Sequence, residues 1–424
     1  LSSSSAASDV YKRQIKAMRR RNFLHVLSFG SLATLSKPRL KEALAWEGEK
    51  EKLVGSLDPS IEVSLNHIAW NLSQVKALVK VPIMAVVKAN AYGHGLAEVA
   101  RFLEKKGIPW LMVGKLEEAF TLRNKGIHCS ILNYGPFSKD DCEEIVSGNI
   151  SQSVYSEETL YLHEQAQKLK KKAGIQIEVD TGMGRVGIPY SKALPLIEKF
   201  SSLSHLEIQG ILTTLTEDRE FDQEQLRRFK EVCRAAEKKG IRLGLRHAAS
   251  SAGILSHPSF YLDMVRPGTA LYGYYPSPET QKEDRLALRP ALRLVAKVTQ
   301  VKDLFPGETL SYHRLYVAQK KMRVATLGIG YSDGYPFQLA GKGFVSIRNK
   351  SFSLIAAVTA NHAMVDLADN REIKVGDEAV LIDNQKQTGL TADILEGWSG
   401  LSTYKILIGL NPLLPRKYII DEKS

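Results

Sequence analysis

The chain has 424 residues, of which 44% are hydrophobic and 25% charged, and this composition excludes wholesale disorder, collagen and coiled-coil arrays. Its formal net charge is +12, of which residues 1–45 carry +7, so the remainder is only mildly basic and we expect no nucleic-acid partner. No apolar run approaches about 18 residues, which predicts no membrane span, and three cysteines without metal-ligand spacing predict no metal site, while one disulfide stays open.

The first 45 residues are expected to lie outside the folded enzyme. Residues 1–17 include Ser4–Gln14, which resembles a translated sequencing adapter. Residues 18–45 start at Met18, continue with three consecutive arginines, a moderately apolar run and a basic stretch, and end in Ala43-Leu44-Ala45. This order resembles a twin-arginine export signal and predicts a periplasmic protein. The alternative is the basic amphipathic start of a cytoplasmic protein.

Residues 57–290 alternate between strand and helix patterns. Apolar residues at spacings of three and four predict a first helix over 65–78, and the clearest later helix, 221–239, ends at Gly240. Eight short apolar runs separate the helical stretches: Ile83–Lys88, Trp110–Val113, Ser130–Tyr134, Ser151–Tyr155, Ile175–Asp180, Leu206–Thr213, Gly244–Ser250 and Tyr261–Arg266. Eight such units predict an α/β fold, a (β/α)₈ TIM-type barrel.

The pattern changes from residue 291 onward. Helical periodicity is nearly absent there, and β-rich segments are broken by Gly, Pro and Asn. The segments are Leu292–Val301, Arg323–Ile329, Gly343–Ile347, Phe352–Val358 and Glu378–Ile382. We therefore predict a separate C-terminal all-β domain over residues 291–424.

Function in such a barrel is expected at the carboxyl ends of its strands. The first strand ends at Lys88. A lysine that leaves an apolar strand at the mouth of a barrel is partly desolvated, which lowers its pKa and frees the amine as a nucleophile. Taken alone, an exposed lysine at a strand end is the simpler interpretation.

Lys88 lies in the first of six motifs that together resemble the alanine racemase family over residues 58–420. The motifs, in the family's order, are Val86–Gly95, Asp180–Gly187, His247–Ala252, Val265–Gly273, Gly330–Tyr335 and Thr403–Leu407. The resemblance implies a pyridoxal 5'-phosphate enzyme of fold type III that racemises amino acids, with Lys88 binding the cofactor covalently.

The resemblance also implies where the cofactor phosphate is held. Gly268 and Thr269 offer backbone amides, and the missing side chain of a glycine allows a phosphate to approach closely. The family implies that the hydroxyls of Ser251 and Tyr404 complete this phosphate site and that Tyr92 helps to hold the cofactor. An ordinary turn is the simpler interpretation of the Arg-Pro-Gly sequence on its own.

Three further residues receive roles from the family. Arg266 is implied to donate a hydrogen bond to the pyridine nitrogen, which leaves the ring unprotonated and favours prompt reprotonation of the substrate. Racemisation needs an acid–base group on each face of Cα, and the family implies Lys88 and Tyr331. Tyr331 belongs to the β domain and enters from the partner subunit in the family, which implies a homodimer with shared active sites. Arg185 is implied to contact either the substrate carboxylate or the tyrosine network.

Two departures from the family pattern fall in the barrel. Glu178 stands where many members have a lysine, often carbamylated, and on a strand it shares a face with Asp180. We hypothesise that its carboxylate orients Arg185. Thr214 stands where the family has a histidine that supports Arg266. A threonine can form a hydrogen bond but cannot stack or carry a charge, which leaves the tuning of Arg266 open.

Two more departures concern the substrate pocket. Residues 359–362 read Thr-Ala-Asn-His where the family has Cys-Met-Asp-Gln. Ala360 removes bulk that roofs the small alanine pocket, and Asn361 removes a negative charge and is also found in broad-specificity periplasmic racemases. We therefore expect specificity wider than alanine. The alternatives are a strict alanine racemase, another reaction on the same barrel such as decarboxylation, and a non-catalytic cofactor carrier or ligand sensor.

Overall fold

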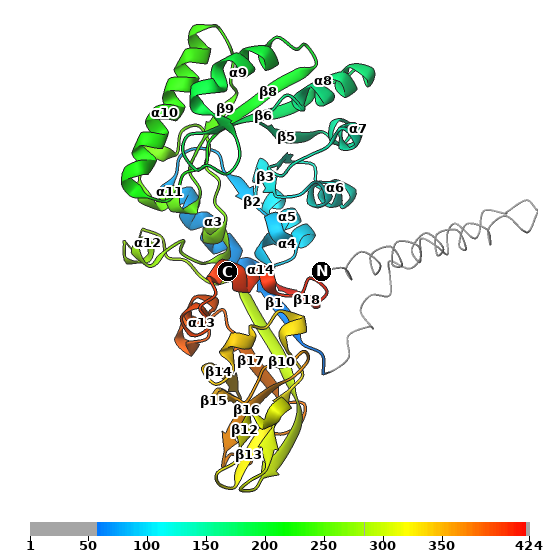
Figure 1. The fold of residues 1–424 in the computed structure, drawn as a ribbon, viewed down its shortest axis with the longest axis vertical. Helices are drawn as coiled ribbons and strands as arrows, with labels where there is room; N and C mark the ends of the chain where they lie inside the picture. The colour runs from blue at the N-terminus through cyan, green and yellow to red at the C-terminus, as the bar shows by residue number, and fades with distance from the viewer. Residues whose placement is uncertain (1–56, 284, 421–424) are drawn as a thin grey trace, which may run out of the picture. The chain divides into compact units, whose positions relative to one another are not determined.

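The computed structural model describes residues 57–283 and 285–420, and Figure 1 shows their arrangement. The adapter-like stretch expected at 1–17 and the export signal expected at 18–45 lie outside these residues. Within the described part of the chain, no helix is both long and apolar enough to cross a bilayer. All three cysteines are described, and none of them is paired.

Seven parallel strands of the described residues form the first sheet, in the order β2-β3-β4-β5-β6-β8-β9. Their bounds are β2 Met84–Val86, β3 Trp110–Val113, β4 Ser130–Asn133, β5 Ile150–Val154, β6 Ala173–Asp180, β8 Leu206–Leu212 and β9 Leu245–His247, with the two-residue β7 (Ile188–Pro189) beside β6. Each of the seven strands in this order overlaps one of the predicted apolar runs, and most of the side chains of these strands are buried.

The eighth predicted strand is reduced to a short bridging segment that closes the ring. Val265 pairs in parallel with Ile83, and its carbonyl accepts the Met84 amide at 2.9 Å. On the other side, the Arg266 amide donates to Ala249 O at 2.8 Å. The segment is therefore bonded to both neighbours, and the predicted TIM-type barrel is confirmed.

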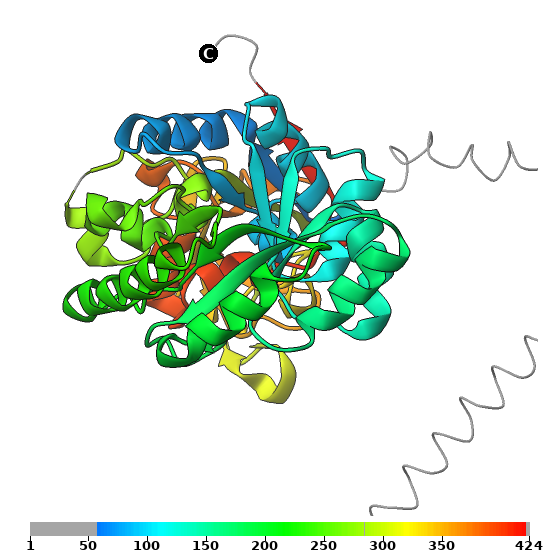
Figure 2. The same cartoon turned by 90° about the horizontal axis from the view of Figure 1, so that it is seen from above.

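Helices surround the ring of strands, as Figure 2 shows from above. Their bounds are α3 Leu65–Leu78, α5 Leu96–Lys105, α6 Leu116–Asn124, α7 Cys142–Ser147, α8 Thr159–Lys168, α9 Ala193–Ser201, α10 Arg219–Lys238, α11 Ser251–Ser256 and α12 Pro278–Lys282. The predicted helices at 65–78 and 221–239 correspond to α3 and α10. Asp218 starts α10 as its N-cap by accepting the Phe221 amide, and the buried Leu226, Phe229 and Val232 face the barrel core.

The second sheet is mainly antiparallel, in the order β13-β16-β15-β14-β17-β10-β1-β18. Its strands are β1 Ser60–Ser64, β10 Leu292–Leu304, β13 Met322–Leu327, β14 Phe344–Ile347, β15 Lys350–Ile355, β16 Ala363–Ala368, β17 Glu378–Ile382 and β18 Arg416–Ile419. The short hairpin of β11 (Thr309–Leu310) and β12 (Tyr316–Val317) and the helices α13 (Ala392–Ser399) and α14 (Thr403–Gly409) accompany it.

Strand β1 departs from the predicted domain boundary. It lies within the range 57–290 expected for the barrel, yet it pairs with β10 and β18 of the C-terminal sheet. The described part of the chain thus passes from the β domain through the barrel and back to the β domain. Apolar alternation shows that a strand exists but does not show which distant strand it joins.

Helix α14 packs against α4 (Lys88–Tyr92), the short turn that carries Lys88. Gly93 makes this contact close, because a Cβ at that position would lie 2.2 Å from Leu407 O of α14, and its φ of 82° is in the left-handed region that favours glycine. Arg416 Nε of β18 donates to Gly93 O at 2.9 Å. The β domain therefore braces the turn that follows the first barrel strand.

Candidate active site

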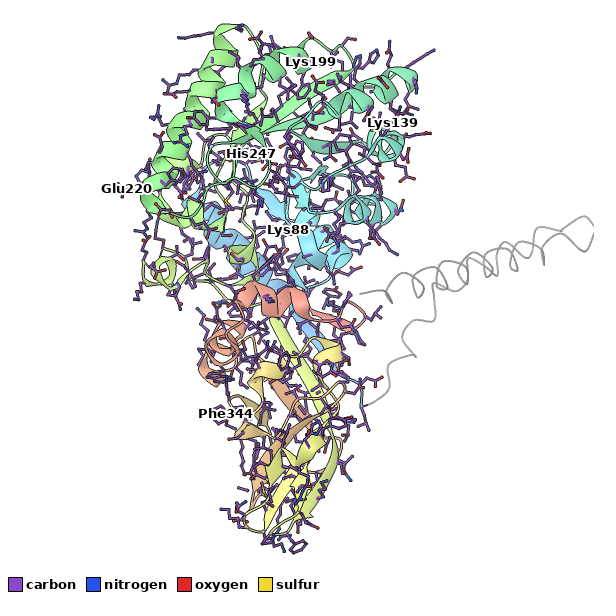
Figure 3. All side chains as sticks on the ribbon, in the orientation of Figure 1. Lys88, Lys139, Lys199, Glu220, His247 and Phe344 are labelled. Atoms are coloured by element: carbon purple, nitrogen blue, oxygen red, sulfur yellow. The ribbon has the colours of Figure 1, made fainter. Side chains whose placement is uncertain are left out.

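A cavity of about 470 Å³ lies at the carboxyl ends of the barrel strands. Eight residues assigned to the site from the sequence line it: Lys88, Tyr92, Arg185, Ser251, Arg266, Gly268, Thr269 and Tyr404. Figure 3 labels Lys88, whose turn packs against α14, and His247, which is the last residue of β9. Five of the six motifs, which are separated by more than three hundred residues at the extremes, thus meet at this cavity, and the motif Gly330–Tyr335 does not.

Lys88 is held by a tightly fixed turn. The backbone runs through left-handed φ values at Ala89, Asn90 and Ala91, and the Asn90 amide donates to Glu118 Oε1 at 3.0 Å. Burial, followed by the positive charge of Arg185, lowers the pKa of Lys88. The structure therefore gives Lys88 the partly desolvated amine that its position at a strand end predicts.

The expected phosphate site is built from two turns and two tyrosines. Ser251 Oγ accepts the Gly268 amide at 2.9 Å, so this amide is bound to protein rather than free, while the Thr269 amide has no protein acceptor among the described residues. A Cβ at Gly268 would lie 2.3 Å from the Tyr92 hydroxyl. The ring of Tyr92 lies edge-on to Tyr404 at a centroid distance of 4.9 Å. Glycine at 268 thus leaves room for Tyr92 at the cavity wall.

Arg266 is buried and firmly held. Its Nη1 donates to His247 Nδ1 at 2.8 Å, and its Nη2 donates to the carbonyls of Thr213 at 2.9 Å and Ala248 at 3.1 Å. Because arginine only donates, His247 Nδ1 is the acceptor, and its Nε2–H then donates to Gln176 Oε1 at 2.8 Å. Burial, reinforced by the charge of Arg266, lowers the pKa of His247 and keeps it neutral. The Nε–H of Arg266 takes no part in these bonds.

Glu178 does not contact Arg185 directly. Its Oε1 accepts the Tyr134 hydroxyl at 2.5 Å and its Oε2 accepts Ser153 Oγ at 3.2 Å. Arg185 Nη2 donates to the same Tyr134 hydroxyl at 3.2 Å, and Thr214 Oγ1 lies 2.9 Å from it. The hypothesised link between Glu178 and Arg185 therefore runs through a tyrosine that the motifs did not include.

Tyr134 and Glu217 also line the cavity, although the sequence analysis assigned them no role. Tyr134 is the last residue of the predicted strand 130–134. Because active-site residues of such barrels lie at the carboxyl ends of the strands, its position could have identified it as a candidate. Glu217 is the only carboxylate among the described residues that line the cavity. It lies in the loop before α10 and belongs to none of the six motifs.

Three predicted residues of the β domain lie outside this cavity. Tyr331 begins the short helix η8 (Tyr331–Asp333), is 56% exposed, and its amide donates to Thr359 O at 2.9 Å. Ser332 Oγ donates to Ala360 O at 2.7 Å and accepts Asn361 Nδ2 at 2.9 Å. Tyr331 and the exposed Asn361 thus form one group with the half-buried Ala360 on adjacent loops, and none of the three lines the Lys88 cavity of their own chain.

Known protein families match nearly all of the described chain. The alanine racemase N-terminal domain matches residues 63–276, and the alanine racemase C-terminal domain matches residues 291–418. The chain belongs to the alanine racemase family. Alanine racemase from Clostridium perfringens (strain SM101 / Type A) is 38% identical over 364 residues, which cover 84% of this chain and 94% of the relative.

Solved alanine racemases share the fold over the same range. The enzyme from Clostridium difficile 630 superposes with a TM-score of 0.82 at 31% identity, covering 87% of this chain and 97% of its own. Alanine racemase from Bartonella henselae, which holds covalently bound pyridoxal phosphate, gives a TM-score of 0.74 at 26% identity, covering 85% and 99%.

The cavity residues fit the family's cofactor, pyridoxal phosphate. Lys88 provides an amine of lowered pKa, Arg266 provides a fixed cation whose Nε–H stays available, and Gly268 leaves room for the Tyr92 hydroxyl at the cavity wall. As a member of this family, the protein is an isomerase of the alanine racemase type that depends on pyridoxal phosphate.

Proposed function

We propose that the protein racemises amino acids by a two-base mechanism, in which Lys88 and the Tyr331 of a second copy act on opposite faces of the substrate Cα. The observation that carries this proposal is the separation of the two residues. Lys88 lines the barrel cavity, whereas Tyr331 is 56% exposed on the β domain of the same chain. A second copy that inserts its Tyr331 loop would complete the site.

A second cavity supports this arrangement. It measures about 560 Å³, lies beside the turn of Lys88, and is lined by Glu118 of α6 and by Leu410 and Pro412 after α14. Lys88 lines this cavity as well as the first, so its side chain separates two spaces. The second space offers a route by which a loop of another subunit reaches the lysine.

The side chains of this chain then have distinct tasks. Pyridoxal phosphate, when bound, supplies the electron sink that weakens the Cα–H bond. Burial lowers the pKa of Lys88, so its amine accepts a proton more readily near neutral pH. Arg266 stays protonated and would donate a hydrogen bond to the pyridine nitrogen of the cofactor. This would weaken the cofactor as an electron sink and favour reprotonation of the substrate Cα over side reactions. Arg185, exposed at the cavity mouth, binds the substrate carboxylate.

We further propose a specificity wider than alanine. Ala360 and Asn361 lie beside Tyr331 through their hydrogen bonds with Ser332, so the loop that brings Tyr331 also brings a small and an uncharged side chain to the substrate. Glu217 supplies a carboxylate at the same cavity, and a carboxylate favours a cationic substrate side chain such as that of lysine or arginine. The alternative is a strict alanine racemase.

We also propose a periplasmic location, because the sequence of residues 18–45 resembles a twin-arginine export signal; the alternative is a cytoplasmic protein. Fractionation of cells that express the full chain tests this location. The protein should appear in the periplasm, and substitution of the paired arginines should retain it in the cytoplasm.

The first experiment measures racemisation of alanine, serine, lysine and arginine by the holoprotein. Turnover of lysine and arginine at rates near that of alanine supports wide specificity, and turnover of alanine alone supports the alternative. Absence of turnover with cofactor bound contradicts racemisation.

Mixing two inactive variants tests the shared site. Lys88→Ala and Tyr331→Phe should each abolish most activity. In a heterodimer of the two, one site regains both bases and the other loses both, so reassociation of an equal mixture should restore about one quarter of wild-type activity. No recovery after reassociation would show that Lys88 and Tyr331 act within one chain.

A further inference from the structure

Arg185 has one hydrogen-bond partner in the described part of the chain, the hydroxyl of Tyr134. Its Nη2 lies 3.2 Å from that oxygen, and its guanidinium carbon lies 6.0 Å from the centroid of the Tyr134 ring. Within the described residues it forms no ion pair with any carboxylate. The nearby Asp180 Oδ1 accepts the backbone amides of Gly182 at 2.9 Å and Gly184 at 3.1 Å. These two hydrogen bonds stabilise the loop that carries Arg185.

The directions of the bonds at the Tyr134 hydroxyl are fixed. A phenol has one proton to donate and lone pairs that accept. Arg185 can only donate, and both oxygens of the Glu178 carboxylate accept hydroxyls, one from Tyr134 at 2.5 Å and one from Ser153 at 3.2 Å. The Tyr134 proton therefore points to Glu178, and Thr214 Oγ1, at 2.9 Å, donates its proton to Tyr134. The hydroxyl is fully bonded in a single arrangement.

We propose that Tyr134 is a positioning residue that holds Arg185 ready for the substrate carboxylate, with Glu178 supplying negative charge through the Tyr134 hydroxyl and Thr214 fixing that hydroxyl. The inference rests on the proposed function, because it assigns Arg185 to the substrate. Hydrogen bonds in a chain polarise one another, so a phenol that donates to a buried carboxylate accepts more strongly from Arg185.

The intervening tyrosine explains how Arg185 can be oriented without being neutralised. A direct pair between arginine and glutamate is frequently bidentate and would occupy the donors that must bind the substrate. The Tyr134 hydroxyl takes one of the five N–H groups of Arg185 and leaves the others free. Glu178, only 1% exposed, contributes charge from behind the tyrosine.

Three strands bring this group together. Glu178 lies on β6, Tyr134 directly follows β4, and Thr214 follows β8. Glu178 and Thr214 are the two barrel positions that depart from the family pattern, and both contact the same hydroxyl. Side chains at strand ends are held more rigidly than side chains in long loops, so the arrangement is pre-organised before substrate arrives.

Tyr134→Phe tests the proposal, because it keeps the ring and removes the hydroxyl. We expect the KM for alanine to rise roughly tenfold, as befits the loss of one hydrogen bond to a charged group, while kcat changes less. Competitive inhibition by acetate, a carboxylate without an amine, should weaken by a similar factor. The cofactor absorbance should be unchanged, because Tyr134 is assigned to the substrate side.

Tyr155→Phe is the matched control, since Tyr155 follows the neighbouring strand β5 and makes no hydrogen bond in the described part of the chain. Its KM should equal that of the wild type. Glu178→Gln should raise KM less than Tyr134→Phe, and adding it to Tyr134→Phe should cause no further rise, because Glu178 acts through that hydroxyl.

An unchanged KM and unchanged acetate inhibition in Tyr134→Phe, with wild-type racemisation intact, would overturn this inference and leave the proposed function standing. A fall in kcat at constant KM would also overturn it. Absence of racemisation by the wild type would overturn both. Because Glu178→Gln is nearly isosteric, it provides the same test if Tyr134→Phe fails to fold.

Discussion

His94, in the motif that contains Lys88, should make the folded protein less stable in acid. It is fully buried, its Nδ1–H donates to Tyr92 O at 2.9 Å and lies 3.1 Å from Ala91 O, and its ring lies 4.6 Å from that of Tyr272. Its Nε2 has no partner among the described residues. A second N–H would therefore enter a site without an acceptor, and burial lowers the pKa of His94 to about 4.

The sign of the effect follows from linkage. A histidine in the unfolded chain has a pKa near 6.5, so the unfolded chain binds a proton at this residue below that pH. In the folded protein His94 stays neutral until the pH falls to about 4. The stabilisation by neutral His94 is complete above pH 6.5 and is lost as the pH falls towards 4. Between pH 7.5 and pH 5 the loss amounts to about 2 kcal/mol.

Urea unfolding of the holoprotein at pH 7.5 and pH 5 measures this loss. His94→Asn retains an amide donor at the Nδ1 position and removes the titrating group. The variant should be less stable at pH 7.5 because its side chain is smaller, but its stability should fall by about 2 kcal/mol less than that of the wild type between the two pH values. Buried His247 is present in both proteins, so its contribution to the pH dependence of stability cancels in the comparison.

His313→Asn is the control, because His313 is exposed and has a φ of 55°, which asparagine tolerates. It should keep the pH dependence of the wild type. If His94→Asn and the wild type lost the same stability between pH 7.5 and pH 5, the assignment of a depressed pKa to His94 would be wrong.

Three further substitutions probe the cofactor and substrate sides of the site. Gly268→Ala places a methyl group 2.3 Å from the Tyr92 hydroxyl, so cofactor affinity should fall by roughly tenfold or more in an absorbance titration. Ala360→Met should lower kcat/KM for lysine several-fold more than for alanine in paired racemisation assays, because it restores bulk over the substrate. Glu217→Gln should lower kcat/KM for lysine and arginine by roughly three- to tenfold and leave alanine unchanged.

The barrel could be predicted from the sequence because its strands are short apolar runs separated by amphipathic helices. The eighth strand was predicted over 261–266, but only Val265 bridges to Ile83. The membership of β1 in the C-terminal sheet could not be predicted, since its pairing with β10 joins residues more than two hundred positions apart. Local patterns identify a strand, whereas packing of the whole chain selects its partner.

The residues of the candidate site likewise include some that the sequence predicted and some that it did not. The residues assigned to the cofactor lie in motifs, and each of them lines the cavity. Tyr134 lies in no motif, and its importance depends on a meeting of three strand ends that only the closed ring produces. Glu217 was not predicted for a related reason. A carboxylate in a loop becomes a candidate site residue only once the fold shows that it lines the same cavity as Lys88, Arg185 and Arg266.

Thr214, which stands where the family has a histidine beside Arg266, forms no hydrogen bond with Arg266 in the described part of the chain. Thr214 turns its side chain to Tyr134, while the preceding residue, Thr213, offers Arg266 its backbone carbonyl. A carbonyl acceptor does not depend on the side chain of the next residue, and His247 Nδ1 and the Ala248 carbonyl supply the remaining contacts. Glu178 and Thr214 therefore both lie on the side of Arg185, and Arg266, which we propose faces the cofactor, keeps its own three acceptors. Because the identity of the reaction depends on that cation, we expect the departures to alter substrate binding and to leave racemisation in place.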